Sequence, residues 1–193
     1  MDAQIDLFAP ASDKAAGPQG LRYQADLISP AEAAALAEHI AGLPFAPFAF
    51  QGWYGNRRTV YFGYRYDFDR RVVEAAAPIP DFLLPLREKV AAFAGRPAED
   101  FVQALVIEYA PGAGIGWHRD RPQFGVVAGV SLLAPCSLRL RRKAGEGWER
   151  TALPIEPRSV YLLTGRVRSQ WEHSIVPMKE LRYAVTFRTL AEG

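Results

Sequence analysis

Three side chains with metal-binding chemistry are spaced so that they could meet. In Trp117-His118-Arg119-Asp120 a histidine and an aspartate are two residues apart, and on an extended segment such residues point to the same face. His173 follows 55 residues after His118, near the start of an apolar segment. Two histidines and one carboxylate form a facial triad for Fe(II) that leaves coordination positions open for a co-substrate and O₂. Spacing alone also allows two unrelated histidines, one hydrogen-bonded in the core and one at the surface.

A second group of chemically useful side chains lies on the last predicted strand, residues 181–189. Its side chains alternate between two sets, which are Tyr183, Val185 and Phe187 on one face and Arg182, Ala184, Thr186 and Arg188 on the other. The Cα atoms of the two arginines would be roughly 20 Å apart, a gap that long side chains leaning inward could reduce to the length of a short dicarboxylate. Arginine pairs with carboxylate through two parallel hydrogen bonds. The alternative is an exposed edge strand whose arginines discourage further pairing.

The elements that must position these residues are two helices followed by many short strands. A strand is expected at 21–25, and Ser29-Pro30-Ala31-Glu32 has the residues of a helix start that leads to a helix ending near 43. A second helix is expected at 80–94. Strands are expected at 102–109, 126–133, 137–142, 151–155, 159–163, 173–176 and 181–189. This order is typical of an α+β chain built on a sandwich or barrel.

Length and composition indicate an ordinary globular domain. The chain has 193 residues, 49% of them hydrophobic and 23% charged, with a formal net charge of only +2. Cys136 is the single cysteine, which excludes an internal disulfide and a cysteine-based zinc site. No apolar run approaches the ~18 residues of a membrane span, so no membrane partner is expected. We expect a cytoplasmic monomer with a flexible arm at 1–20 and one domain at 21–193.

Taken together, the motifs resemble those of the AlkB-type Fe(II)/2-oxoglutarate-dependent dioxygenases. The resemblance rests on His118-Arg119-Asp120, on His173, and on Arg182 and Arg188 in an Arg-x-x-x-x-x-Arg frame. Tyr109-Ala110-Pro111-Gly112 is similar to the Tyr-x-x-Gly segment of that family. The resemblance covers about residues 21 to 190. It implies a double-stranded β-helix (jelly roll) core with N-terminal buttressing helices.

The resemblance also implies a role for each motif. His118, Asp120 and His173 would hold Fe(II), and Arg188 would pair with the end of 2-oxoglutarate that chelates iron. Arg182 and Tyr109 would hold the distal carboxylate of this co-substrate, and O₂ would be the oxidant. Residues 51–66 fall where the family places its substrate-recognition lid, whose aromatic rings could stack on an extruded base. The implied substrate-binding residues are Trp53, Tyr54, Arg57, Arg58, Tyr61 and Arg121. The alternative for the lid is an amphipathic hairpin that buries Tyr61 and Phe62.

The function implied by the resemblance is oxidative demethylation of alkylated bases in DNA or RNA, which is a form of DNA dealkylation repair. The reaction releases succinate, CO₂ and formaldehyde. A basic stretch could follow the phosphates of the nucleic acid, or it could be a charged exposed hairpin; its members are Arg139, Arg141, Arg142, Lys143 and Arg150.

Three positions depart from the family pattern and keep other functions open. Ile107 and Ala184 stand where the family often has asparagine near 2-oxoglutarate, and Arg121 follows the metal aspartate where some members carry an acidic residue. One alternative is the same oxygenase chemistry on a protein side chain or a small molecule. Another is a non-catalytic jelly-roll binding module.

Overall fold

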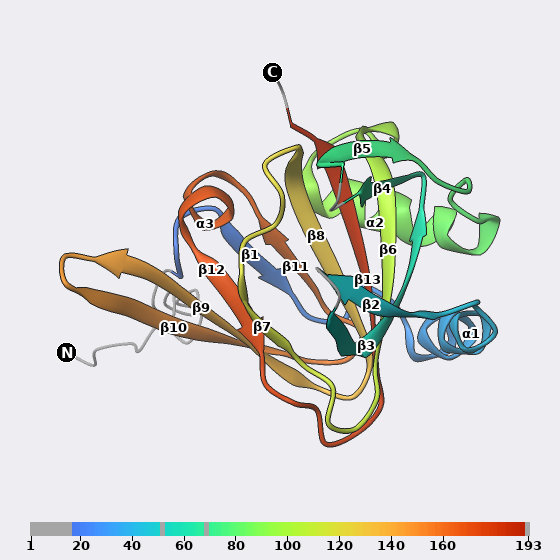
Figure 1. The fold of residues 1–193 in the computed structure, drawn as a ribbon. Helices are drawn as coiled ribbons and strands as arrows, with labels where there is room; N and C mark the ends of the chain where they lie inside the picture. Colours follow the sequence, from blue (N-terminus) through green and yellow to red (C-terminus); the bar gives the residue numbers. More distant parts are fainter. Residues whose placement is uncertain (1–16, 51–52, 68–69, 192–193) are drawn as a thin grey trace, which may run out of the picture.

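Two antiparallel sheets face one another in the computed structural model, which describes residues 17–50, 53–67 and 70–191 (Figure 1). The helices are α1 (Pro30–Ala41), α2 (Leu84–Ala94) and α3 (Gly165–Gln170), with single 3₁₀ turns at Asp81–Leu83 and Ala98–Asp100. The strands of the first half are β1 (Leu21–Gln24), β2 (Ala46–Phe50), β3 (Trp53–Phe62), β4 (Tyr64–Asp67), β5 (Val72–Ala75) and β6 (Phe101–Tyr109). Those of the second half are β7 (Ile115–His118), β8 (Phe124–Leu133), β9 (Cys136–Ala144), β10 (Gly147–Ile155), β11 (Val160–Leu163), β12 (Glu172–Ile175) and β13 (Arg182–Leu190).

The larger sheet has seven strands in the order β1-β11-β8-β13-β6-β3-β2. The C-terminal strand β13 lies near its centre and pairs along most of its length with β8 on one side and β6 on the other. The side chain of Arg182 is accordingly buried, with 1% of its surface exposed. The alternative of an exposed edge strand for residues 181–189 is therefore wrong, because both edges of this strand are hydrogen-bonded.

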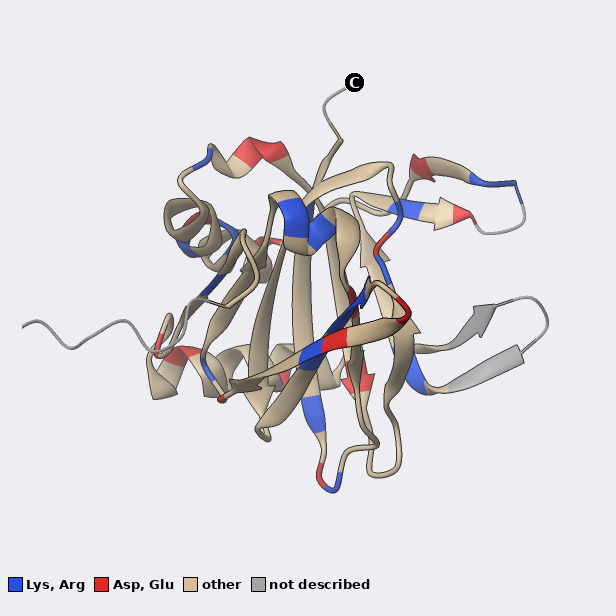
Figure 2. Ribbon diagram, turned by 90° about the vertical axis from the view of Figure 1, so that its left-hand side faces the viewer, with Lys and Arg blue, Asp and Glu red and all other residues tan. Residues whose placement is uncertain are grey.

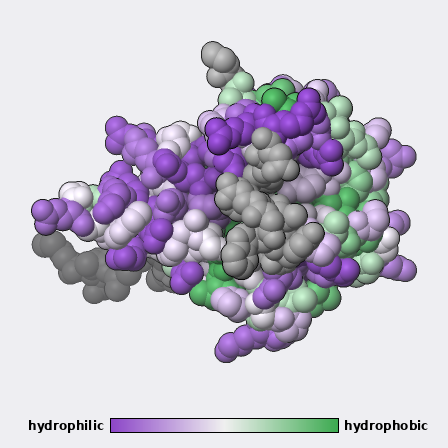
Figure 3. All heavy atoms as spheres, viewed as in Figure 1, coloured by the Kyte–Doolittle hydropathy of each residue, from purple (hydrophilic) through white to green (hydrophobic). Residues whose placement is uncertain are grey.

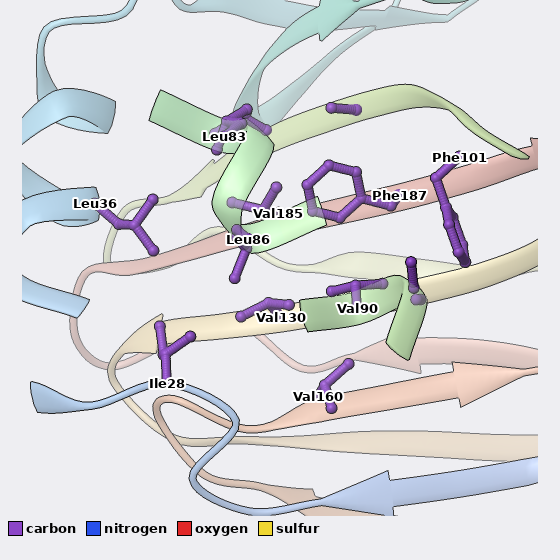
Figure 4. Packing of buried hydrophobic residues seen from close by; sticks show 14 of the residues in the cluster. Ile28, Leu36, Leu83, Leu86, Val90, Phe101, Val130, Val160, Val185 and Phe187 are labelled. Atoms are coloured by element: carbon purple, nitrogen blue, oxygen red, sulfur yellow. The ribbon is translucent and has the colours of Figure 1, made fainter. Parts of the chain in front are cut away.

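The first core lies between the larger sheet and the two long helices (Figure 4). Helix α1 begins with a capping box, in which the Ser29 hydroxyl accepts a hydrogen bond from the Glu32 amide and the Glu32 carboxylate accepts one from the Ser29 amide. Helix α2 ends at Gly95, whose φ of 70° is in the left-handed region that glycine tolerates best. The buried side chains that join helices and sheet include Leu36, Ile40, Leu83, Leu86, Val90, Val106, Val130, Val185 and Phe187.

The second core lies between the two sheets and contains the predicted chemistry. The smaller sheet has the order β10-β9-β12-β7 and contributes Leu138, Leu140 and Ile175 to it. On β13 the alternation predicted from the sequence separates the two cores, since Val185 packs toward the helices and Ala184 packs between the sheets. The two facing antiparallel sheets agree with the predicted jelly-roll core.

The predicted lid, residues 51–66, falls mainly on strands β3 and β4. Its part from Arg58 to Phe62 pairs with β6 and so belongs to the larger sheet. Of the predicted arm, residues 1–16 lie outside the described part of the chain. Gln19 and Gly20 are hydrogen-bonded, because their carbonyls accept from the Val167 and Thr164 amides. Among the helices of the described residues, none has the length and apolar character needed to cross a bilayer.

Candidate active site

His118, Asp120 and His173 come together at one end of the smaller sheet. His118 is the last residue of β7 and is the direct register partner of His173 on the neighbouring strand β12. Their ring centroids are 4.2 Å apart. Asp120 follows two residues after β7, and its Oδ2 lies 3.6 Å from Nε2 of His173. Antiparallel pairing thus brings side chains 55 residues apart in sequence into contact.

The carboxylate of Asp120 has one oxygen that is bound and one that is not. Oδ1 accepts hydrogen bonds from Nε and Nη2 of Arg188 at 3.0 and 2.7 Å. Oδ2 is buried and has no hydrogen-bond partner. A buried carboxylate oxygen without a partner is costly unless a cation completes it. Burial by itself would raise the pKa of Asp120, but Arg188, His173, His118 and Arg168 hold it below its ordinary value.

The two histidines are prepared to act as neutral nitrogen ligands. Nδ1 of His118 lies 2.9 Å from the carbonyl oxygen of Gly116, which can only accept, so Nδ1 carries the proton and Nε2 keeps its lone pair. Burial lowers the pKa of His118, and burial together with the neighbouring His118 lowers the pKa of His173 to about 3. Two neutral imidazoles and one carboxylate are the donor set that suits Fe(II). No three such side chains already surround a common point in the described chain, so iron would have to draw these donors together.

These shifts predict that the metal-free protein loses stability in acid. A buried histidine with a pKa of about 3 stays neutral where the unfolded chain, with a pKa near 6.5, binds a proton. The free energy of unfolding is therefore highest above pH 6.5 and falls as the pH drops toward 3, by on the order of 4 kcal/mol. Urea unfolding at several pH values in the presence of a chelator measures this. His173→Gln should flatten the profile and His39→Gln, outside the site, should not; equal slopes in all three proteins would contradict the prediction.

Arg188 is held by more than the aspartate. Its Nη1 donates to Oε1 of Gln103 on β6 at 2.8 Å, and Nε2 of Gln103 donates to the carbonyl of Tyr64 at 2.7 Å. The sequence did not indicate Gln103, whose role depends on the pairing of β13 with β6. The signal that was available is a polar residue at the start of an apolar strand. Arg188 therefore orients the carboxylate of Asp120, in addition to the predicted contact with 2-oxoglutarate.

Arg182 is a buried cation, and one of its guanidinium nitrogens has no hydrogen-bond partner in the described part of the chain. Its Nε donates to Oγ of Ser131 at 2.9 Å and its guanidinium carbon lies 5.2 Å from the centre of the Tyr109 ring. Nη1 is buried and has no hydrogen-bond partner. No carboxylate forms an ion pair with Arg182 among the described residues. The Tyr109 ring lies beside Arg182 and lines the cavity next to His118 and His173, whereas Arg182 is not among the residues that line this cavity.

The two departures from the family pattern near 2-oxoglutarate are direct neighbours. Ile107 on β6 and Ala184 on β13 are register partners in the larger sheet. Both are buried in the core between the sheets. Both positions where the family often has asparagine are therefore apolar in this chain. A single such change could leave the other amide side chain buried without a hydrogen-bond partner, whereas the two changes together leave neither amide. Binding of the distal carboxylate would depend on Arg182 and Tyr109.

A cavity of about 440 Å³ opens beside the histidines and Asp120. Of the predicted substrate-binding residues, Arg57, Tyr61 and Arg121 line it. Arg58 does not, because neighbouring strand residues point to opposite faces, and its guanidinium binds both carboxylate oxygens of Glu108. The prediction that Arg58 contacts substrate is corrected accordingly. The side chains of Trp53 and Tyr54 lie outside the described residues.

Arg168, which the sequence did not indicate, fastens the segment that carries Asp120. From α3 its guanidinium donates to the carbonyls of Asp120, Arg121, Phe124 and Gly125 at 3.2, 2.6, 2.6 and 3.0 Å. One half-buried side chain thus fixes the backbone on the C-terminal side of Asp120. No local pattern signals this role, because all four acceptors are main-chain atoms of a distant segment, the loop after β7 and the start of β8.

Arg168→Met should weaken Fe(II) binding by about 10- to 100-fold, the usual cost of removing a group that supports metal ligands. The reason is that Asp120 loses the backbone anchor that sets its position. Anaerobic titration with Fe(II) measures the affinity. Arg166→Met removes an exposed arginine from the same helix and should leave the affinity unchanged. Equal affinities of both variants would refute the anchoring role.

Sequence comparison identifies relatives of this chain. The chain is 28% identical over 149 residues to an Arabidopsis thaliana protein described as "Alkylated DNA repair protein ALKBH8 homolog", a match that covers 64% of this chain and 43% of that protein. This chain therefore spans less than half the length of that relative. This chain is also 26% identical over 158 residues to uncharacterized protein L905 of Acanthamoeba polyphaga mimivirus. That match covers 70% of this chain and 70% of the viral protein.

Solved structures show the same fold at low sequence identity. The structure of OsALKBH1 matches with a TM-score of 0.65 at 16% identity, over 88% of this chain and 96% of that chain. A Pseudomonas putida prolyl-4-hydroxylase matches with a TM-score of 0.63 at 14% identity, over 89% and 93% of the two chains. In the comparison with protein families, residues 20–188 match the 2OG-Fe(II) oxygenase superfamily. This match spans most of the chain, and the protein therefore belongs to the 2OG-Fe(II) oxygenase superfamily, whose reaction uses Fe(II), 2-oxoglutarate and O₂.

Proposed function

We propose that this oxygenase removes methyl groups from alkylated bases in DNA or RNA. The observation that carries the proposal is the cavity beside His118, Asp120 and His173. Its volume of about 440 Å³ is in the range of small-molecule sites, which hold ligands in roughly 300–1,000 Å³. Tyr61 and Tyr66 give it aromatic walls. Enzymes that act on a base extrude it from the strand and hold it between such walls.

Arginines at the mouth of the cavity favour an anionic substrate. Arg121 lies 5.0 Å from the centre of the Tyr66 ring and lines both this cavity and an adjoining open groove of about 900 Å³. The groove is also lined by Arg96 and Arg119. A phosphate-bearing strand that placed one base in the cavity would pass these cations. The name of the Arabidopsis relative, an alkylated DNA repair protein, points to the same class of substrate.

In this proposal the residues divide the reaction between them. When bound, the iron supplies oxidation of a methyl C–H bond by O₂, as 2-oxoglutarate is converted to succinate and CO₂. His118, Asp120 and His173 would hold the metal, and Arg188 would keep the carboxylate of Asp120 in place. Arg182 would hold the distal carboxylate of 2-oxoglutarate. The hydroxymethyl group formed on the base nitrogen then leaves as formaldehyde when its C–N bond breaks.

The test is to incubate iron-loaded protein and 2-oxoglutarate with pools of methylated DNA, RNA and peptides and to analyse each pool by mass spectrometry. We expect loss of methyl groups from an oligonucleotide together with succinate formation. Oligonucleotide affinity should fall steeply from low to moderate salt. Peptides that gain oxygen while oligonucleotides stay unchanged would show that the substrate is a protein side chain. Absence of succinate in all pools would favour a non-catalytic binding module.

A further inference from the structure

The outer face of the smaller sheet carries alternating arginine and tryptophan side chains, which we call the ladder face. Strand alternation turns His118, Leu140 and His173 inward, so that their neighbours in sequence point outward. The outward set, aligned by the pairing of β7, β12, β9 and β10, consists of Trp117, Arg139, Arg141, Lys143, Trp148 and Arg150. Lys143 and Arg150 are exposed and the other four are half-buried. In Figure 1, β9 and β10 form a hairpin that projects from the body of the protein.

The side chains of the ladder face stack on one another. The guanidinium carbons of Arg139 and Arg141 lie 5.0 and 4.4 Å from the centre of the Trp117 ring. Arg141 also lies 4.1 Å from the Trp148 ring, and the Lys143 ammonium lies 5.1 Å from that ring. Each distance is within the range of a cation–π contact. The result is a continuous row of cations and rings from the hairpin to the residue next to His118.

Two further bonds hold the arginines in fixed positions. Nε of Arg139 donates to Oγ of Ser174 at 3.1 Å, and Nε of Arg141 donates to Glu172 at 2.7 Å. Both acceptors belong to β12. The η nitrogens at the far ends of Arg139 and Arg141 form no hydrogen bond within the described part of the chain. These donors are therefore ordered in advance, which reduces the entropic cost of binding an anion.

The charge of the ladder face is out of proportion to that of the chain. It carries four basic side chains against the single carboxylate of Glu172, whereas the whole chain has a formal net charge of only +2. The nearby acids are placed elsewhere, since Glu149 pairs with Arg142 on the opposite face and Glu146 lies in the turn of the hairpin. Figure 3 shows this side of the molecule as strongly hydrophilic. In Figure 2 the hairpin points toward the viewer, and blue bands mark its basic residues.

We propose that the ladder face binds the backbone of single-stranded nucleic acid and leads it to the active site. Successive outward residues on β9 are about 6.6 Å apart, a repeat that suits an extended strand of phosphates. Ordered cations beside aromatic rings are the features that proteins use for single strands. Trp117 places the end of this row directly beside His118. The substrate class rests on the proposed function, but the binding step does not depend on catalysis.

The test is fluorescence anisotropy of labelled, unmodified single-stranded DNA and RNA, measured on the full chain without iron. Lys143→Gln combined with Arg150→Gln should weaken binding by about tenfold or more and reduce the magnitude of the slope of log affinity against log salt by about 1.4, the value for two lost contacts to a single strand. Trp148→Leu leaves the charge unchanged and should weaken binding by about two- to fivefold, since Arg141 loses a stacking partner. Arg142→Gln is the matched control, one residue away but on the opposite face, and should bind like the unaltered protein.

The outcomes separate this proposal from the proposed function. Loss of binding in the ladder variants without demethylation of any pool supports the ladder face and overturns only the demethylase function. Demethylation of oligonucleotides with unchanged binding by all ladder variants overturns the ladder face alone. If an acidic peptide competes as well as the oligonucleotide and shows the same variant dependence, nucleic acid is the wrong partner. Tighter binding of duplex than of single strands would also overturn the proposal.

Discussion

Asp120→Ala is expected to weaken Fe(II) binding by at least about 100-fold and to abolish turnover, because the aspartate is the single carboxylate of the donor set. Removing a group that merely supports a ligand costs 10- to 100-fold, so removing a ligand should cost no less. The change also leaves Arg188, 12% exposed, without its ionic partner. Breaking such a pair typically costs about 3–5 kcal/mol of folding stability. Anaerobic Fe(II) titration and urea unfolding measure the two effects.

Two further variants separate metal binding from the ion pair. Asp120→Asn keeps an oxygen for Arg188 but lacks the negative charge, so it should recover part of the stability and little of the iron affinity. Asp100→Ala breaks another carboxylate–arginine pair, the one between Asp100 and Arg96. The carboxylate of Asp100 is far more exposed than that of Asp120. That variant should bind iron normally. Iron affinity that survives Asp120→Ala would rule out the aspartate as a ligand.

Arg182→Met is expected to remove 2-oxoglutarate binding without destabilising the ligand-free protein. A bidentate contact between guanidinium and carboxylate involves two charge-assisted hydrogen bonds of about 1.5–3 kcal/mol each, so the affinity should fall by about 100-fold or more. Without the ligand, however, Arg182 is a buried cation with an unpartnered Nη1. Replacing a buried charge by an apolar side chain of similar size is often neutral or stabilising by about 1–4 kcal/mol.

The hydroxyl of Ser131 determines how much the folding stability of Arg182→Met increases. In Arg182→Met the buried Oγ loses its donor, which offsets part of the stabilisation. The double variant with Ser131→Ala removes that group as well and should be the most stable of the three proteins. Calorimetric titration with 2-oxoglutarate and urea unfolding are the two measurements. Normal co-substrate affinity, or a loss of stability beyond about 3 kcal/mol in the double variant, would contradict a carboxylate site at Arg182.

The sequence indicated the side chains proposed for the chemistry, but it did not indicate the residues that hold them in position. His118 and Asp120 could be paired because a two-residue spacing in an extended segment fixes a common face, and β13 has the alternation that places Arg182 and Arg188 on the same face. Gln103 and Arg168 could not be predicted, since their partners come from distant segments. The pair Arg57 and Arg58 shows the limit within a strand. Alternation requires that one of them faces away from the cavity, but only the register with Glu108 decides which.

Strand β7 and helix α3 are two of the elements that the sequence did not predict, and the reasons are local. Strand β7 has four residues flanked and interrupted by Gly114 and Gly116, so it shows no alternating pattern. Helix α3 has six residues and a single buried side chain, Val167, which is too little for a helical stripe. Both elements owe their existence to tertiary contacts. They are also the elements that carry His118 and Arg168.

The placement of β13 between two partners has a consequence for how the site opens. Strand β13 is hydrogen-bonded on both sides, whereas β7 is a four-residue strand at the edge of the smaller sheet. Local opening of proteins starts at such edges, and amide exchange is slowest in strands that lie inside a sheet. Arg182 and Arg188 therefore belong to the most persistent part of the structure, and His118 belongs to a part that opens readily. For the proposed iron site, we therefore expect metal exchange to proceed through brief fraying of β7 while the arginines stay in place.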